Sequence, residues 1–329
     1  MIGVFGSGSW ATAVAKIVLE HPNTTINWWI REPEIIEGIK ETGHNPVYLS
    51  EVDFDVERIH FSNDIKEVIA KSDDLLFVVP SAFLDNSLEG VTPEMFAGKN
   101  VHSAIKGIVL QTNQIVADYF HDKFNVDYNR ISIISGPSHA EETAQQKLTY
   151  LTVASQNEEL AKFVAEFIEC RYVKTVVSED IHGIEYAAVL KNIYALAAGI
   201  CKGLGYGDNL FAVLISNAMQ EMDSFINSMH PMDSRQLERF PYLGDLLVTA
   251  YSQHSRNRTF GAMIGFGYSV KGAQFEMKMV AEGYYATKCI EQIRTNIGIS
   301  MPIVEAVYKV LYEGCSARRI MGELLKNLK

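Results

Sequence analysis

The chain has 329 residues, of which 47% are hydrophobic and 21% charged, and its formal net charge is −11. This length predicts about two domains, and the acidic balance argues against general binding to nucleic acid or anionic membranes. The four cysteines are scattered without metal-ligand spacing, which predicts reduced thiols and no metal site. No run of about 18 apolar residues and no signal peptide are evident. We therefore expect a cytoplasmic protein without membrane insertion.

The first half of the chain alternates strand-like and helix-like segments. Apolar or β-branched runs predict strands at 2–6, 25–30, 74–80, 100–106, 130–136, 148–154 and 171–177. Helical spacing occurs between them at 11–20, 63–70, 111–120 and 158–169. Strands that alternate with helices predict βαβ units and an α/β domain with a mostly parallel sheet.

After about residue 178 the pattern becomes helical. Helices are expected at 180–200, 208–229, 273–294, 302–313 and 317–327, and no convincing strand is found there. The sequence therefore predicts an N-terminal α/β domain over residues 1–178 and an all-α C-terminal domain over residues 179–329.

A glycine-rich segment, GSGSWA, joins the first predicted strand to the first predicted helix. Gly6 suits the tight turn, Gly8 permits close approach of a pyrophosphate, and Ala11 permits close packing of the helix on the strand. A strand, this spacing and a helix together predict a dinucleotide site of the Rossmann type. A glycine loop without a ligand is the simpler alternative.

The end of the second predicted strand bears on the choice of dinucleotide. Arg31 suits the 2′-phosphate of NADP, whereas the following Glu32 leaves NAD open. Arg31 as an ordinary surface charge is the alternative. The sequence allows NADP or NAD and favours NADP.

Two further strand ends carry polar residues, and ligands of open α/β sheets bind at the carboxyl ends of strands. Lys106 ends one strand and could contact a substrate oxygen, or it could be a solvated loop lysine. Ser138 follows another strand and, with Glu141 three positions later, predicts a helix N-cap and capping box. The same turn could present backbone N–H groups to a ligand.

Lys191 lies on an apolar stripe of a predicted helix. Ile184, Ala188 and Ala195 share its face at helical spacing. Burial lowers the pKa of a lysine toward neutrality, where it can exchange a proton with a carbonyl or hydroxyl oxygen. The alternative is a lysine whose stem packs in the core while its ammonium group reaches water.

A second group of polar residues follows in the helical half. Ser255 predicts the N-cap of a helix that begins at Arg256-Asn257, and such an N-terminus beside an arginine suits a phosphate. Arg258 could assist or lie on the surface. Asp245 could orient a catalytic lysine or a substrate hydroxyl, or it could cap the next helix.

These segments together resemble the bacterial-type NAD(P)-dependent glycerol-3-phosphate dehydrogenase family. The resemblance rests on motifs in order along nearly the whole chain: GSGSWATA at 6–13, VPS at 79–81, SAIKGI at 103–108, SGPSHAEE at 135–142, VLKNIYALAAGI at 189–200, GDN at 207–209, LGDLLVT at 243–249, SRNRTFG at 255–261 and MPI at 301–303. It implies reversible reduction of dihydroxyacetone phosphate to sn-glycerol 3-phosphate, which feeds glycerophospholipid synthesis, by a cytoplasmic homodimer.

The resemblance also assigns roles to residues. Lys191 would be the general acid, and the substrate would contact Lys106, Gly136, Ser138, Lys191, Asp245, Ser255, Arg256 and Asn257. The cofactor would contact Gly6, Gly8, Ser9, Trp10, Arg31, Lys106, Ala140, Arg256, Val280 and Glu282. The chain departs from the family pattern at His139, in ERFPYLGDL and in VAEGYYAT.

Two other functions compete with this one. The first is a dehydrogenase of the same two-domain plan that acts on another β-hydroxyacid or sugar phosphate. The second is a regulatory protein that senses the dinucleotide without turnover, which would not need Lys191, Lys106 and the arginine-led helix together.

Overall fold

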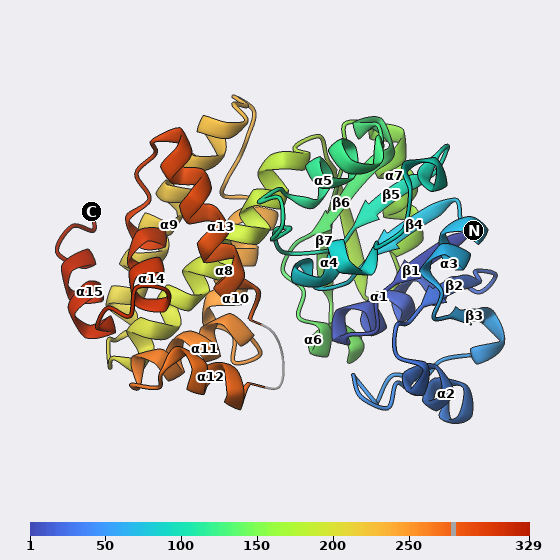
Figure 1. Ribbon diagram of the computed structural model, residues 1–329, viewed down its shortest axis with the longest axis horizontal. Helices are drawn as coiled ribbons and strands as arrows, with labels where there is room; N and C mark the ends of the chain where they lie inside the picture. Colours follow the sequence, from blue (N-terminus) through green and yellow to red (C-terminus); the bar gives the residue numbers. More distant parts are fainter. Residues whose placement is uncertain (278–280) are drawn as a thin grey trace. The chain divides into compact units, whose positions relative to one another are not determined.

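The computed structural model describes residues 1–277 and 281–329 (Figure 1). The chain forms two compact units. Unit 1 comprises Met1–Ile105 and Val116–Ile181, and unit 2 comprises Lys106–Ile115 and His182–Lys329. The predicted boundary after residue 178 lies near the third and last point at which the chain passes from one unit to the other, after Ile181. The sequence did not indicate that Lys106–Ile115 belongs with the C-terminal part.

Unit 1 is built on an eight-stranded sheet with strand order β3-β2-β1-β4-β5-β6-β7-β8. Its strands are β1 (Ile2–Phe5), β2 (Ile26–Trp29), β3 (Ile59–Ser62), β4 (Asp74–Phe77), β5 (Asn100–Ser103), β6 (Ile131–Ser135), β7 (Thr149–Ala154) and β8 (Val173–Ser178). Neighbouring strands are parallel except β6 and β7. The predicted α/β class with a mostly parallel sheet is confirmed, although β3 was not predicted.

The central strands of the sheet are buried along their whole length, as expected for a parallel sheet covered by helices. The helices of unit 1 are α1 (Ser9–Leu19), α2 (Pro33–Thr42), α3 (Ile65–Lys71), α4 (Ser81–Ser87), α5 (Val116–Phe124), α6 (Ala140–Ala144) and α7 (Glu158–Ile168). Helix α1 packs with α6 and α7, while α3 and α5 pack around the short turn at Pro93–Phe96.

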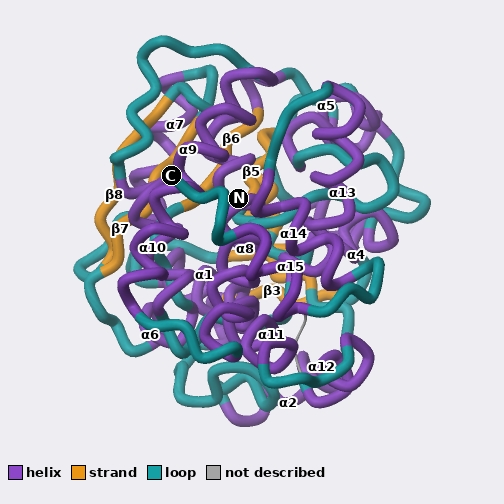
Figure 2. Tube along the Cα trace, turned by 90° about the vertical axis from the view of Figure 1, so that its left-hand side faces the viewer, coloured by secondary structure: helices purple, strands orange, loops and turns teal. Residues whose placement is uncertain are grey.

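The described part of unit 2 is helical, and every strand labelled in Figure 2 belongs to unit 1. Its helices are α8 (Ile181–Gly203), α9 (Asp208–Met229), α10 (Asp245–Tyr251), α11 (Arg256–Gly265), α12 (Val270–Glu276), α13 (Glu282–Ile297), α14 (Pro302–Leu311) and α15 (Ala317–Leu324). The all-α prediction is confirmed. The single helix expected at 273–294 is wrong, because Met277 takes an extended backbone that ends α12, and α13 begins only at Glu282.

Helix α8 is the central element of unit 2. Its length and mean hydropathy would allow it to span a membrane, but its apolar window is entirely buried, as in the core helix of a soluble protein. Gly199 and Gly203 face Gly261 and Gly265 of α11, and a Cβ atom at any of them would overlap the backbone of the other helix. The two backbones are therefore in direct contact, which fixes the start of α11 relative to α8.

Candidate active site

The glycine-rich turn after β1 is held by hydrogen bonds from β2. The backbone N–H of Gly6 donates to the Trp29 carbonyl at 3.1 Å, and Trp28 Nε1 donates to the Gly6 carbonyl at 2.7 Å. Gly6 has φ +133°, and a Cβ there would lie 2.8 Å from the Val78 carbonyl. Only glycine fits this position without strain, as the sequence predicted for the tight turn.

A buried asparagine fixes the next part of the turn. Asn45 Nδ2 donates to the Ser7 carbonyl at 3.1 Å and to Thr12 Oγ1 at 2.9 Å. Gly8 then precedes α1 as its N-cap without a side-chain capping bond, and a Cβ at Gly8 would meet no atom within 4 Å. Open space before a helix N-terminus suits the pyrophosphate of a dinucleotide. Sequence reasoning missed Asn45, which lies in an irregular segment far from the turn along the chain.

Other predicted cofactor residues lie beside this turn or at neighbouring strand ends of unit 1. Ser9 and Trp10 open α1, and Trp10 Nε1 donates to the Ala104 carbonyl at 3.1 Å, just beyond β5. Ala140 is the buried first residue of α6. These placements agree with the expected positions, and contact with a cofactor stays a prediction.

The predicted capping box at Ser138 is wrong. The N-cap of α6 is His139, and Ser138 Oγ instead donates to the Gly136 carbonyl at 3.0 Å. Gly136 has φ +131°, so the chain turns sharply before the helix and the Ser138 hydroxyl closes this turn.

A charged cluster lies at the end of β2. Glu32 accepts a hydrogen bond from Ser7 Oγ at 2.9 Å through one carboxylate oxygen. The other oxygen accepts from Nε and Nη2 of Arg31, at 2.9 Å and 2.5 Å. Arg31 is therefore paired with its neighbour and does not stand alone at the strand end.

Unit 2 contains a cluster of two lysines and one aspartate, in which Lys191 and Asp245 are buried and Lys106 is partly exposed. Lys191 is only 4% exposed and forms an ion pair with Asp245, which is 1% exposed. Lys106 Nζ lies 3.6 Å from the second carboxylate oxygen of Asp245. The sequence correctly placed Lys191 among apolar residues, but α8 is buried on nearly all sides, so the ammonium group relies on Asp245 rather than on water.

Burial lowers the pKa of Lys191 to about 7. The Asp245 carboxylate opposes this shift, and the nearby Lys106 ammonium adds to it. A lysine with this pKa exchanges a proton readily at neutral pH, as general acid–base catalysis requires.

Asp245 owes its position to an unusual local backbone. It is the first residue of α10 and follows a π-helical turn at Phe240–Gly244, within the segment that departs from the family pattern. Its two carboxylate oxygens face the two lysines. Of the three roles considered from the sequence, namely orienting a lysine, orienting a substrate hydroxyl and capping the next helix, the geometry fits the first.

An asparagine network links the lysine cluster to two helix N-termini. Asn192 Nδ2 donates to the Lys106 carbonyl at 2.8 Å, and Asn257 Nδ2 donates to Asn192 Oδ1 at 2.9 Å. Asn257 Oδ1 accepts from the N–H of Gly283, next to Glu282, at 2.9 Å. Sequence reasoning missed Asn192, although it directly follows Lys191. Val280 lies outside the described residues.

The start of α11 has the predicted form. Ser255 is the N-cap, and its hydroxyl accepts from the N–H of Arg258 at 3.2 Å. Arg256 is the exposed first residue of the helix, while Asn257 is buried. The predicted N-cap is confirmed, and phosphate binding here stays a prediction.

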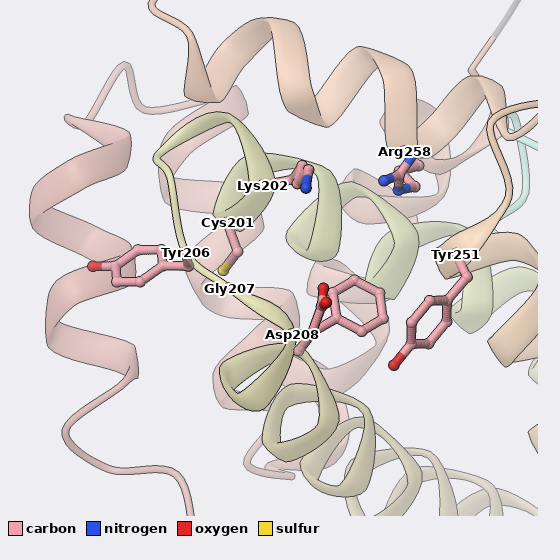
Figure 3. A pocket seen from close by; sticks show the side chains of 8 residues that line it. Cys201, Lys202, Tyr206, Gly207, Asp208, Tyr251 and Arg258 are labelled. Atoms are coloured by element: carbon pink, nitrogen blue, oxygen red, sulfur yellow. The ribbon is translucent and has the colours of Figure 1, made fainter.

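A separate pocket lies further along α8. It is lined by Cys201, Lys202, Tyr206, Gly207, Asp208, Phe211, Tyr251 and Arg258 (Figure 3). Cys201 is ten residues beyond Lys191, or about 15 Å along the helix axis. None of the predicted site residues lines this pocket, and Arg258, which the sequence left open, points its side chain here (Figure 3).

A Rossmann-type sheet with a glycine-rich turn, joined to a helical unit with a buried lysine, defines a two-domain nucleotide-dependent dehydrogenase. The models of the NAD-dependent glycerol-3-phosphate dehydrogenase N-terminus and C-terminus match residues 1–161 and 180–322. The chain belongs to this family.

Individual relatives agree with this assignment. A glycerol-3-phosphate dehydrogenase (NAD(P)+) of Salinibacter ruber is 34% identical over 98% of this chain and 94% of its own length. The crystal structure of glycerol-3-phosphate dehydrogenase from Coxiella burnetii has a TM-score of 0.92 at 28% identity, covering 99% of this chain and 98% of that chain. A ketopantoate reductase from Ralstonia eutropha covers 98% of this chain and 99% of its own, and shares the fold alone, with a TM-score of 0.62 at 15% identity.

Proposed function

We propose that this protein catalyses the reversible, NAD(P)H-dependent reduction of dihydroxyacetone phosphate to sn-glycerol 3-phosphate. The observation that carries the proposal is the buried pair of Lys191 and Asp245, with Lys106 beside it, in a chain of the glycerol-3-phosphate dehydrogenase family. A dinucleotide sensor would have no use for a buried lysine of near-neutral pKa, so this observation favours an enzyme.

The cofactor is NAD or NADP, which supplies the hydride that reduces the ketone carbon. Negative charge then develops on the ketone oxygen, and Lys191 donates a proton to it. Lys106 and protonated Lys191 together exceed the charge of Asp245 by one, so the cluster carries a positive charge that stabilises the developing alkoxide. In the reverse reaction neutral Lys191 accepts the proton from the alcohol.

The substrate phosphate would bind at the start of α11. Ser255, Arg256 and Asn257 lie at this N-terminus, whose N–H groups and guanidinium favour an anion. Gly136 and Ser138, in the turn after β6, are also proposed to contact the substrate. The residues proposed to line the cofactor site are Gly6, Gly8, Ser9, Trp10, Arg31, Lys106, Ala140, Arg256, Val280 and Glu282.

At the level of the whole chain, residues 1–178 would bind the dinucleotide and residues 179–329 the substrate. We propose a cytoplasmic homodimer that inserts into no membrane and binds no nucleic acid, in keeping with the net charge of −11. Its product would supply the glycerol phosphate backbone of glycerophospholipids.

The test compares dihydroxyacetone phosphate with unphosphorylated dihydroxyacetone, each with NADH and with NADPH. Oxidation of the reduced cofactor, followed by absorbance, should occur with the phosphorylated ketone and be at least about a hundredfold slower without the phosphate, because the charge-assisted contacts at α11 are lost. Equal rates with both ketones would refute the phosphate site, and no rate with either would refute the proposed reaction.

A further inference from the structure

Two features that the proposed reaction leaves without a role meet in the pocket at the end of α8. The GDN motif at 207–209 opens α9, and Arg258 lies on α11 two positions beyond Arg256, the proposed phosphate contact. Two helical positions correspond to a rotation of about 200°, so the side chains of Arg256 and Arg258 leave α11 on nearly opposite sides. The pocket is therefore separate from the proposed substrate phosphate site.

The backbone of Arg258 is held from two directions. Its N–H donates to the hydroxyl of Ser255, the N-cap of α11, at 3.2 Å. Its carbonyl lies so close to α8 that a Cβ on Gly199 would come within 2.1 Å of it. From this fixed backbone the Arg258 side chain lines the pocket together with Lys202, which belongs to the last turn of α8 (Figure 3). The position of the guanidinium is thus set by the packing of α11 on α8.

The Arg258 guanidinium carries a buried donor that the described residues leave unpaired. Its Nε atom is buried and has no hydrogen-bond partner within residues 1–277 and 281–329. Leaving a buried, charged donor without an acceptor is costly, so such a group in a native protein usually faces a ligand, an ion or water. Over the same described residues Lys202 forms no ion pair. Both cations are therefore available to a negatively charged ligand.

The start of α9 adds backbone donors to the same pocket. Its N-cap is Gly207, where a Cβ would meet no atom within 4 Å, so no side chain caps the helix and the space before it is open. The N–H of Phe211 donates to the Gly207 carbonyl at 3.3 Å, and the N–H groups of residues 208–210 precede this first turn of intrahelical bonds. They carry the positive end of the dipole of a 22-residue helix.

The charge balance among the lining residues is positive. Lys202 and Arg258 exceed the one carboxylate, that of Asp208, by a single charge, although the whole chain has a net charge of −11. Phe211 and Tyr251 form an aromatic wall, with ring centroids 4.2 Å apart and the rings edge to face. Apolar ring surface beside the cations lowers the local dielectric constant, which strengthens charge-assisted hydrogen bonds to an anion.

We propose that this pocket binds a phosphoryl group, either as inorganic phosphate or as part of a small phosphate ester. The three terminal oxygens of a phosphoryl group suit donors that arrive from a guanidinium, an ammonium group and a helix N-terminus. A planar carboxylate has fewer acceptor atoms and a smaller charge, so it would leave part of this donor set unpaired. The site goes beyond the proposed reaction and does not depend on it, because neither the ketone nor the dinucleotide takes part.

The test is an NMR titration of ¹⁵N-labelled full-length protein with inorganic phosphate. The amide signals of residues 208–210 should shift in a saturable manner, because the bound anion accepts hydrogen bonds from these N–H groups. Arg258→Gln should raise the dissociation constant read from these signals by at least about tenfold. Lys202→Gln changes an exposed residue and so leaves the fold intact, and it should raise the constant by about three- to tenfold.

Lys271→Gln is the matched control, because Lys271 is an exposed lysine of unit 2 on α12 that does not line the pocket. It should leave the dissociation constant unchanged. Titrations with methyl phosphate and with acetate identify the ligand class. Tighter binding of methyl phosphate than of inorganic phosphate would assign the site to an ester, and the reverse order would assign it to the free ion. Either result supports the inference if acetate binds at least about tenfold more weakly.

Three results would overturn the inference. They are unchanged amide signals at 208–210, acetate binding there as tight as that of phosphate, and Lys202→Gln and Arg258→Gln variants that both behave like Lys271→Gln. The amide signals of residues 256–258 report the proposed substrate phosphate site in the same spectra. Their failure to shift would count against that proposed site and leave the inference about the pocket standing.

Discussion

At the scale of single residues, the proposed chemistry depends on Lys191, whose ammonium and neutral forms lie close in free energy at neutral pH. Burial destabilises the ammonium form of Lys191, and the Asp245 carboxylate stabilises it. The result is a pKa of about 7, so both protonation states are accessible near neutral pH. A group in this condition can serve as the acid for ketone reduction and as the base for alcohol oxidation.

This balance predicts a pH dependence of opposite sign in the two directions. Reduction requires protonated Lys191, so its kcat/KM should fall as pH rises through about 7, and oxidation should rise over the same range. Asp245→Asn removes the group that favours the proton, so the falling limb should move to lower pH. Asp233→Asn, the same change at an exposed site, should not move it. The measurement is kcat/KM for reduction, from initial rates across the pH range. The account would be contradicted if the fall in kcat/KM occurred at the same pH in Asp245→Asn as in the wild type.

The sequence could predict the surroundings of residues whose structural neighbours are also close to them in the chain. Lys191 on its apolar stripe and Ser255 before its helix are examples, since their neighbours are a few positions away. The role of Asn192 could not be predicted, because its partner, the Lys106 carbonyl, is 86 residues away along the chain. The prediction for Ser138 was wrong for a related reason. The sequence pattern matched a capping box, but the Ser138 hydroxyl donates to the Gly136 carbonyl in the preceding turn.

At the scale of elements, the crossing of α8 and α11 is the feature that positions the site. Both helices place glycines four residues apart at the contact, at Gly199 and Gly203 and at Gly261 and Gly265, and the backbones touch there. Because Lys191 is on α8 and Arg256 starts α11, this crossing fixes the distance between the proposed proton donor and the proposed phosphate site.

The sequence patterns missed elements with few buried apolar residues. The edge strand β3 is an example, because only Ile59 is buried in it.

Gly199→Ala tests this crossing. Alanine favours a helix by about 1 kcal/mol over glycine, but its Cβ would overlap the Arg258 carbonyl, so the free energy of unfolding should fall by about 1–3 kcal/mol. Gly322→Ala in α15 is the matched control, because a Cβ there meets nothing within 4 Å, and it should be neutral or stabilising. Urea unfolding measures both, and equal stability of the two variants would show that the crossing is not close-packed.

At the scale of the whole molecule, the two units hold different residues of the proposed site. The glycine-rich turn and Arg31 belong to unit 1, whereas Lys106, Lys191 and Asp245 belong to unit 2. The fold class of each half followed from periodicity, because alternation and helical spacing are repeated over many residues. The transfer of Lys106–Ile115 to unit 2 did not follow, because it depends on long-range contacts that no local pattern records.

Lys191→Met is the most direct test, since it removes the proposed proton donor in unit 2 and leaves the glycine-rich turn in unit 1 intact. The measurement is the rate of NADH oxidation with dihydroxyacetone phosphate at neutral pH, with the NADH dissociation constant determined on the same protein. The account predicts a rate at least about a hundredfold below wild type, within the range of general acid catalysis, and an unchanged dissociation constant. A near-normal rate in a variant that still binds NADH would contradict it.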